Sequence, residues 1–144
     1  MPTVRRAEPR DADRVLALLA GLGRPAVADD PSGQREVFLD HLASDDAIVL
    51  VADVDGEPAG VASLWIRPRL NWGSPEAWIP DLYVDPAHRR RGLARALLDA
   101  CVVAARARGC HEVKLESGRQ RAEAHRLYAA YGFAHTGRAY RLKL

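Results

Sequence analysis

The spacing of apolar residues predicts a chain that alternates between helices and strands. From Leu93 to Ala105, apolar side chains recur at helical spacing. A long helix is therefore expected from Arg90 to Arg108, with Gly109 as its stop. Acidic, Asp-Pro and glycine signals predict three further helices. These open at Asp11, at Pro31 (with Asp30 as the cap) and at about Gln120.

Six shorter segments have the composition of strands. They cover residues 3–7, 47–53, 58–67, 77–84, 112–116 and 134–142. Pro80 lies inside the fourth segment, where its missing N–H cannot donate to a neighbouring strand. Either the strand begins only at Asp81, or it continues through a β-bulge or a gap in pairing. The apolar Trp78 and Ile79 extend the strand pattern and favour a strand that continues past such a gap. A helix joins the fourth and fifth strands, so these two should run parallel.

Composition narrows the class of protein. The 144 residues suffice for one domain, and 48% hydrophobic with 28% charged residues is typical of a globular protein. A net charge of +2 argues against a general nucleic-acid binder. No apolar run approaches the ~20 residues of a membrane span, and no signal peptide is recognisable, so a cytoplasmic location is expected. Cys101 and Cys110 lack metal-ligand spacing and are interpreted as small hydrophobic residues.

One stretch carries the clearest chemistry, because it predicts a strand, a tight loop and a helix start in succession. The loop follows Asp85-Pro86 and contains Arg89, Arg90 and Arg91 before Gly92. Unpaired N–H groups and the helix dipole make such a helix start attractive to anions, and Gly92 leaves room for a ligand. Phosphate or pyrophosphate binding is one interpretation, and a capped helix with a solvated basic turn is the other.

The pattern Arg89-x-x-Gly92-x-Ala94 resembles the acyl-CoA pyrophosphate loop of the Gcn5-related N-acetyltransferases, the GNAT family. A second segment, Ala124-His125-Arg126-Leu127-Tyr128 with Gly132-Phe133, is similar to a later motif of the same family. The resemblance spans Thr3 to Leu142. It implies one α/β (α+β) domain over 1–144, with a central mixed sheet of about six to seven strands flanked by four helices. It also implies that the fourth and fifth parallel strands splay apart.

The resemblance implies acetyl-CoA as co-substrate. No metal is expected, because no cluster of histidine, cysteine and aspartate residues has the spacing of a zinc site. The resemblance assigns cofactor binding to the backbone of the fourth strand and to the basic loop. These residues are Leu82, Tyr83, Val84, Arg89, Arg90, Arg91, Gly92, Leu93 and Ala94. Acetyl transfer also needs a base, because a lysine-like amine is mostly protonated at neutral pH. Asp81 is the candidate base, although it could instead be a structural hydrogen-bond acceptor, and Glu116 is its substitute. Tyr128 is the candidate acid, and its alternative role is core packing.

The acceptor is predicted only as a small-molecule or peptide amine. Trp72 and Trp78, with Asp29-Asp30, are candidates to line its pocket, although single exposed aromatic and acidic residues are common. No nucleic-acid or membrane partner is expected, and a homodimer remains open. The alternative function is a catalytically silent acyl-CoA-binding regulatory domain.

Overall fold

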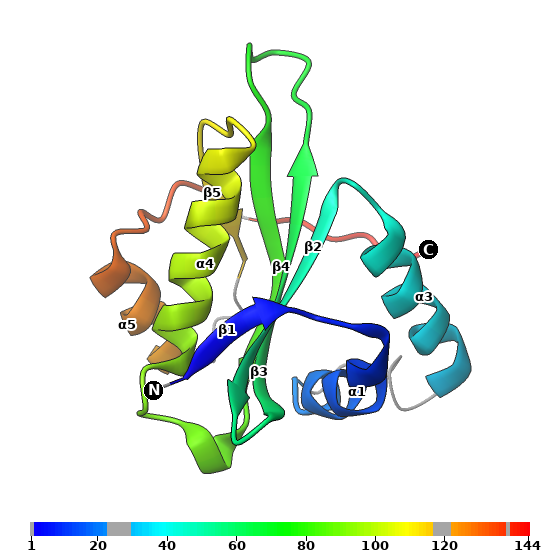
Figure 1. The fold of residues 1–144 in the computed structure, drawn as a ribbon. Coiled ribbons are helices and arrows are strands. Elements are labelled where there is room, and N and C mark those ends of the chain that lie inside the picture. Colours follow the sequence, from blue (N-terminus) through cyan, green and yellow to red (C-terminus); the bar gives the residue numbers. More distant parts are fainter. Residues whose placement is uncertain (1, 23–29, 117–121, 138) are drawn as a thin grey trace. The chain divides into compact units, whose positions relative to one another are not determined.

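The fold is described from a computed structural model, which covers residues 2–22, 30–116, 122–137 and 139–144. The chain divides into two compact units, residues 1–114 and 115–144, and each is described by itself. Figure 1 shows the strands and the helices around them. Within the described ranges, no helix is long and apolar enough to cross a membrane.

Five strands form one sheet in the order β1-β2-β3-β4-β5. They are β1 (Thr3–Arg6), β2 (Ala47–Val54), β3 (Glu57–Arg67), β4 (Glu76–Val84) and β5 (Val113–Leu115). The first four strands pair antiparallel. As predicted, β5 runs parallel to β4. The bonds between these segments include Ala77 N to Glu112 O and His111 N to Pro75 O, each 3.0 Å.

Four α-helices are described, as predicted. They are α1 (Ala12–Ala20), α3 (Pro31–Ala43), α4 (Leu93–Ala107) and α5 (Ala122–Tyr131), with two 3₁₀ turns, η1 (Pro9–Asp11) and η2 (Pro86–His88). In Figure 1, α4 lies on one side of the strands and α1 with α3 on the other. The Asp30 carboxylate accepts from Gly33 N at 2.9 Å, which confirms the predicted cap of α3.

The predicted start of the long helix and the predicted number of strands are wrong. The long helix begins at Leu93 and not at Arg90, because Arg90 and Gly92 have φ of 63° and 79°, which a right-handed helix cannot include. The sheet has five strands among the described residues, not six to seven. Described residues between 134 and 144 contain no strand, although Tyr140, Leu142 and Leu144 alternate with basic residues. A strand requires a hydrogen-bonded neighbour as well as alternation. The predicted helix start at Gln120 lies outside the described residues.

The core lies on both faces of the sheet. The buried side chains of α4 include Leu97, Leu98 and Cys101, which are fully buried. Burial raises the pKa of the Cys101 thiol to about 12, so this cysteine behaves as the predicted small hydrophobe. Cys110 is half-buried. On the opposite face, Val15 and Leu18 of α1 pack in one cluster with strand residues.

A partly buried charge cluster joins β1, β2 and the start of α1. The Arg5 guanidinium donates two bonds to Asp11, at 2.7 and 2.9 Å, and its Nε donates to Asp53 at 2.7 Å. Glu8 N also donates to Asp11, which is only 4% exposed. The bonds from Arg5 lower the pKa of Asp11 more than its burial raises it. Because the folded-state pKa is depressed, the resulting stability is present at neutral pH and is lost on acidification.

The Asp11→Asn variant tests this cluster. It removes the charge but keeps the shape, and we expect it to lower the free energy of unfolding at pH 7 by about 2 kcal/mol. The wild type should lose this advantage as the pH falls below the ordinary aspartate pKa of about 3.9. Denaturant unfolding at several pH values measures both effects. Asp13→Asn is the control, because Asp13 pairs with Arg35 at an exposed position. Equal effects of the two variants would contradict a special role for Asp11.

Candidate active site

The interruption of pairing predicted at Pro80 is present in β4 and takes the form of a β-bulge. Trp78 pairs with Trp65 of β3, and Asp81 pairs with Ser63, so two residues of β4 face one residue of β3. The two residues are Ile79 and Pro80, and Pro80 has no N–H to lose from the ladder. The bulge puts Trp78 and Asp81 on the same face of the sheet although three positions separate them.

Asp81 is half-buried on this face and is fixed by its cross-strand neighbour. The hydroxyl of Ser63 donates to Asp81 Oδ2 at 2.9 Å. The same face carries Trp65, whose ring lies edge-on to the ring of His41 of α3, with 4.9 Å between the ring centres. Asp81 therefore has a defined position toward the α3 side of the sheet.

Beyond the bulge, β4 presents backbone groups at its outer edge. Asp85 N donates to Ala59 O of β3 at 2.8 Å, and Tyr83 pairs with Val61. Since N–H directions alternate along an antiparallel strand, the N–H groups of Leu82 and Val84 face away from β3. This is the arrangement required if β4 is to bind an extended ligand through its backbone.

The side chain of Tyr83 belongs to the core instead. It is buried in the cluster with Val15 and Leu18 of α1. A Cβ on Gly21 would lie 2.3 Å from the Tyr83 hydroxyl oxygen, so the end of α1 can approach Tyr83 only through glycine. Because its backbone pairs with Val61 of β3, Tyr83 presents neither its side chain nor its N–H at the outer edge of β4.

The basic loop ends at the open start of α4. Gly92 has φ 79° and precedes Leu93, and α4 has no side-chain cap. Its first N–H groups have no acceptor within the helix. A Cβ added at Gly92 would meet no atom within 4 Å, so there is room for a ligand beside the backbone. Leu93 is buried, and its backbone alone can reach that space, whereas Ala94 is half-buried.

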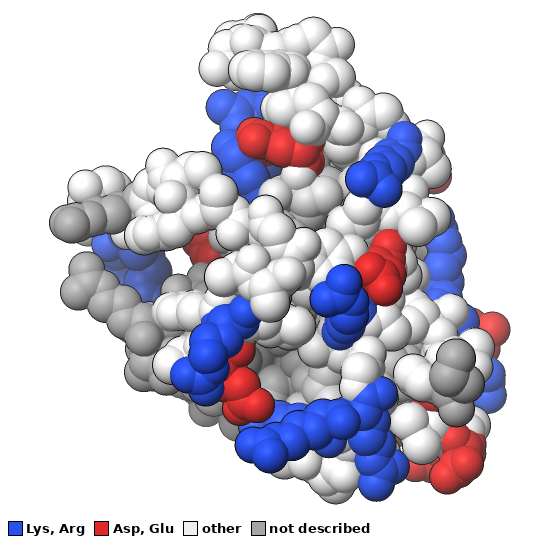
Figure 2. All heavy atoms as spheres, turned by 90° about the vertical axis from the view of Figure 1, so that its left-hand side faces the viewer, with Lys and Arg blue, Asp and Glu red and all other residues white. Residues whose placement is uncertain are grey.

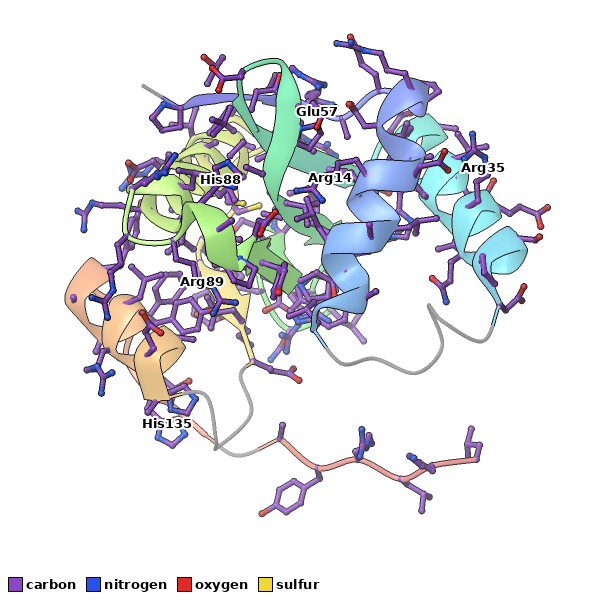
Figure 3. The ribbon with its side chains drawn as sticks, turned by 90° about the horizontal axis from the view of Figure 1, so that it is seen from below. Arg14, Arg35, Glu57, His88, Arg89 and His135 are labelled. Carbon is purple, nitrogen blue, oxygen red and sulfur yellow. The ribbon has the colours of Figure 1, made fainter. Side chains whose placement is uncertain are left out.

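The three arginines of the loop differ in their surroundings. Arg89 folds back, with Nε donating to Val84 O at 3.3 Å and the guanidinium carbon 5.5 Å from the centre of the Tyr83 ring. Figure 3 shows Arg89 close to the end of β4. Arg90 and Arg91 are exposed. On the face drawn in Figure 2, basic side chains are interspersed with acidic and uncharged ones, with the longest blue run at the lower edge.

Tyr128 and Glu116 belong to the second unit, residues 115–144. Tyr128 is half-buried on α5, with its ring edge-on to Phe133 at 6.0 Å, and its carbonyl accepts from Phe133 N at 2.9 Å. Gly132, between them, has φ 119°. Glu116 is exposed. Asp81 and the basic loop lie in the first unit, and the structure describes these candidates in separate surroundings.

A buried carboxylate that the sequence did not reveal lies at the start of β4. Glu76 is 2% exposed and pairs with Arg69, Lys114 and Arg67 at 2.8, 3.0 and 3.1 Å. Burial raises its pKa, but the bonds from Arg69 and Lys114 and the charge of Arg67 lower it further. Glu76 is therefore ionised and held by three cations, which makes it a structural anion and not a candidate base.

The residues predicted to line an acceptor pocket have partners of their own. The Trp72 ring stacks on the His111 ring, with 4.4 Å between the ring centres. The guanidinium carbon of Arg67 lies 4.6 Å from the centre of the Trp78 ring. Asp30 is occupied as the cap of α3, and Asp29 lies outside the described residues. Among the residues that can be described, no group of histidine, cysteine and acidic side chains could hold a metal ion.

Comparisons with known proteins agree with this geometry. The model of the acetyltransferase (GNAT) family matches residues 15–133. Aminoglycoside N(6′)-acetyltransferase type 1 of Stenotrophomonas maltophilia is 35% identical over 141 residues, covering 95% of this chain and 89% of that protein. An acetyltransferase structure from Trypanosoma brucei has a TM-score of 0.83 at 27% identity, with 100% of both chains covered.

A further solved structure shares the fold. It is AAC(6′)-Iy in complex with the bisubstrate analog CoA-S-monomethyl-acetylneamine, with a TM-score of 0.80 at 24% identity, and 100% of this chain and 99% of that chain are covered. The family match and the 35% identical relative together settle the assignment: this chain belongs to the GNAT family of acetyltransferases.

Proposed function

We propose that residues 1–144 form one catalytic domain that transfers the acetyl group of acetyl-CoA to a primary amine of an aminoglycoside-like acceptor. The observation that carries the proposal is the open start of α4, where Gly92 has φ 79° and leaves space beside the backbone. The acceptor class rests on the aminoglycoside N(6′)-acetyltransferase that is 35% identical over 95% of this chain.

The basic loop is the proposed seat of the CoA pyrophosphate. Backbone N–H groups at Gly92, Leu93 and Ala94 would donate to the phosphate oxygens, in the positive field of the dipole of the 15-residue helix α4. The exposed Arg90 and Arg91 would add charge. Arg89 is bonded to Val84 O, so its share in this seat is to shape the loop as well as to supply charge.

The outer edge of β4 is the proposed seat of the pantetheine arm and the thioester. The N–H groups of Leu82 and Val84 point away from β3 and would donate to carbonyl oxygens of the donor, which stabilises charge developing on the thioester oxygen. β5 has three residues and β4 has nine, so β5 can pair with only part of β4. This supports the expectation that the two strands part toward the carboxyl end of β4 to admit the arm.

Asp81 is the proposed base. Deprotonating an amine with a pKa of roughly 10.4 at pH 7 costs on the order of 4–5 kcal/mol, so a carboxylate that accepts the proton directly or through water has a clear task. The amine nitrogen then attacks the thioester carbon, and the carbon–sulfur bond breaks. Tyr128 is the proposed acid that returns a proton to the CoA sulfur. Glu116 remains the substitute base.

Gly92→Glu tests the pyrophosphate seat. The new side chain places a negative charge where phosphate would bind, and we expect at least ~100-fold weaker binding of acetyl-CoA in calorimetry. Gly109→Glu is the matched control, because Gly109 also has positive φ (73°) and open surroundings but follows the other end of α4. Both variants carry similar backbone strain. Unchanged affinity in a folded Gly92→Glu variant would refute the proposed seat.

Asp81→Asn tests the base. Its turnover at pH 7 should fall by about 100-fold and recover partly at higher pH, where free amine becomes more abundant. Ser63→Ala is the companion variant, because it removes the hydrogen bond to Asp81 but keeps the carboxylate. If Asp81 is only a structural partner of Ser63, the two variants should lose the same activity with the same pH profile. That result would move the proposed role to Glu116 or to water.

Tyr128→Phe tests the acid. It keeps the ring against Phe133 and removes the donor, so turnover should fall by roughly 10- to 100-fold while CoA affinity and thermal stability stay near wild type. Tyr131→Phe, on the same helix and also beside Phe133, is the control. Steady-state and single-turnover rates separate chemistry from product release. Wild-type single-turnover rates in Tyr128→Phe would leave Tyr128 as a packing residue.

A further inference from the structure

The loop proposed to bind pyrophosphate is anchored at its start by Asp85. Four bonds fix this residue: its N–H donates to Ala59 O at 2.8 Å, its carbonyl oxygen accepts from His88 N at 2.8 Å, its Oδ1 accepts from Ala87 N at 3.0 Å, and its Oδ2 accepts from Arg14 at 2.6 Å. Asp85 thereby caps η2, the turn that leads from β4 into the basic loop. The direction in which the loop leaves the sheet depends on these bonds.

Arg14 reaches this anchor from α1, far away in the sequence. Its Nη2 donates to Asp85 Oδ2, and its Nε donates to Pro58 O of β3 at 2.9 Å. Figure 3 shows Arg14 pointing from α1 toward the strands, on the side where His88 and Arg89 lie. One guanidinium thus ties together a helix, the start of β3 and the turn after β4.

The charges around Asp85 suit this arrangement. The bond from Ala87 N is the largest cause of a lowered Asp85 pKa, followed by the bond from Arg14, so Asp85 is ionised at neutral pH. His88 Nδ1 lies 3.9 Å from the same Oδ2 atom that Arg14 holds. The planar guanidinium donates in two directions at once, which a single lysine ammonium in its place would do less well.

We propose that Arg14 is a positioning residue for the cofactor loop: by holding Asp85 and Pro58 together, it sets the geometry in which the loop meets the pyrophosphate. The inference rests on the proposed acetyl-CoA site at Arg89–Ala94. It adds a residue 71 positions away from Asp85, on a helix that carries none of the residues assigned to that site.

The test compares two acetyl donors that differ only beyond the pantetheine arm. Acetyl-CoA contains the pyrophosphate, whereas S-acetylpantetheine has the same thioester and arm without it. Arg14→Gln should raise the KM for acetyl-CoA and the Kd for CoA by about 10-fold. This is the low end of the effect expected when a residue is lost that only orients the groups in contact with the ligand. The kcat with acetyl-CoA and the kcat/KM with S-acetylpantetheine should stay within about twofold of wild type. Arg14→Lys should recover part of the loss.

Arg35→Gln is the matched control. Arg35 of α3 pairs at 2.7 Å with Asp13, which lies on α1 next to Arg14, and this exposed ion pair does not involve Asp85. Arg35→Gln should leave the Kd for CoA and the kcat/KM for both donors unchanged. Thermal unfolding of each variant shows whether it is folded.

The inference is overturned if folded Arg14→Gln behaves like Arg35→Gln, or if it lowers the kcat/KM for both donors by the same factor. If the wild type itself fails to bind CoA, the proposed function is wrong. If the wild type binds and Gly92→Glu does not, while Arg14→Gln is normal, only the role of Arg14 is wrong.

Discussion

The missing N–H of Pro80 is the constraint on which the rest of the site depends. Before the bulge, the N–H of Ala77 points to the β5 side, and the N–H of Trp78 points to β3. In an uninterrupted strand, the N–H of Tyr83 would reach the outer edge, and those of Leu82 and Val84 would be used in the ladder. The extra residue reverses this order. It also turns Asp81 to the face that carries Trp65 and Trp78.

A second constraint acts where β4 ends. The loop must leave the sheet in one direction and deliver the open end of α4, and it is fixed at both ends. Asp85, held by Ala87 N and Arg14, fixes the start, and Gly92 at φ 79° makes the final turn. Between them, Arg90 has φ 63°, a strained conformation for a residue with a side chain. Such strain is common where backbone groups are held ready for a ligand.

Local signals in the sequence predicted those parts of the fold that local chemistry decides. Pro80 implied a bulge or a gap in pairing, Asp30-Pro31 implied the start of α3, and helical spacing implied α4. The start of α4 was misplaced because Arg-Arg-Arg gives no sign of positive φ before Gly92. The last predicted strand failed because alternation around Tyr140 reveals no partner strand.

Contacts between distant residues were the parts that sequence reasoning missed. Arg14 bonds to Asp85 across 71 positions of sequence. Glu76 forms ion pairs with Lys114 of β5 as well as with its neighbours in the β3–β4 hairpin. Neither pairing leaves a spacing that one sequence could reveal, since the first depends on how α1 packs against the sheet and the second on which strands are neighbours. The partnership of Ser63 with Asp81 likewise follows from the bulge.

Amide hydrogen exchange of β4, with and without acetyl-CoA, tests the central claim most directly. The account predicts that Tyr83, paired with β3, is protected in the free protein, whereas Leu82 and Val84 gain protection only when acetyl-CoA is added. Gly92, Leu93 and Ala94 should gain protection in the same experiment. Protection of Leu82 and Val84 that is already complete in the free protein, or unchanged by saturating acetyl-CoA, would contradict it.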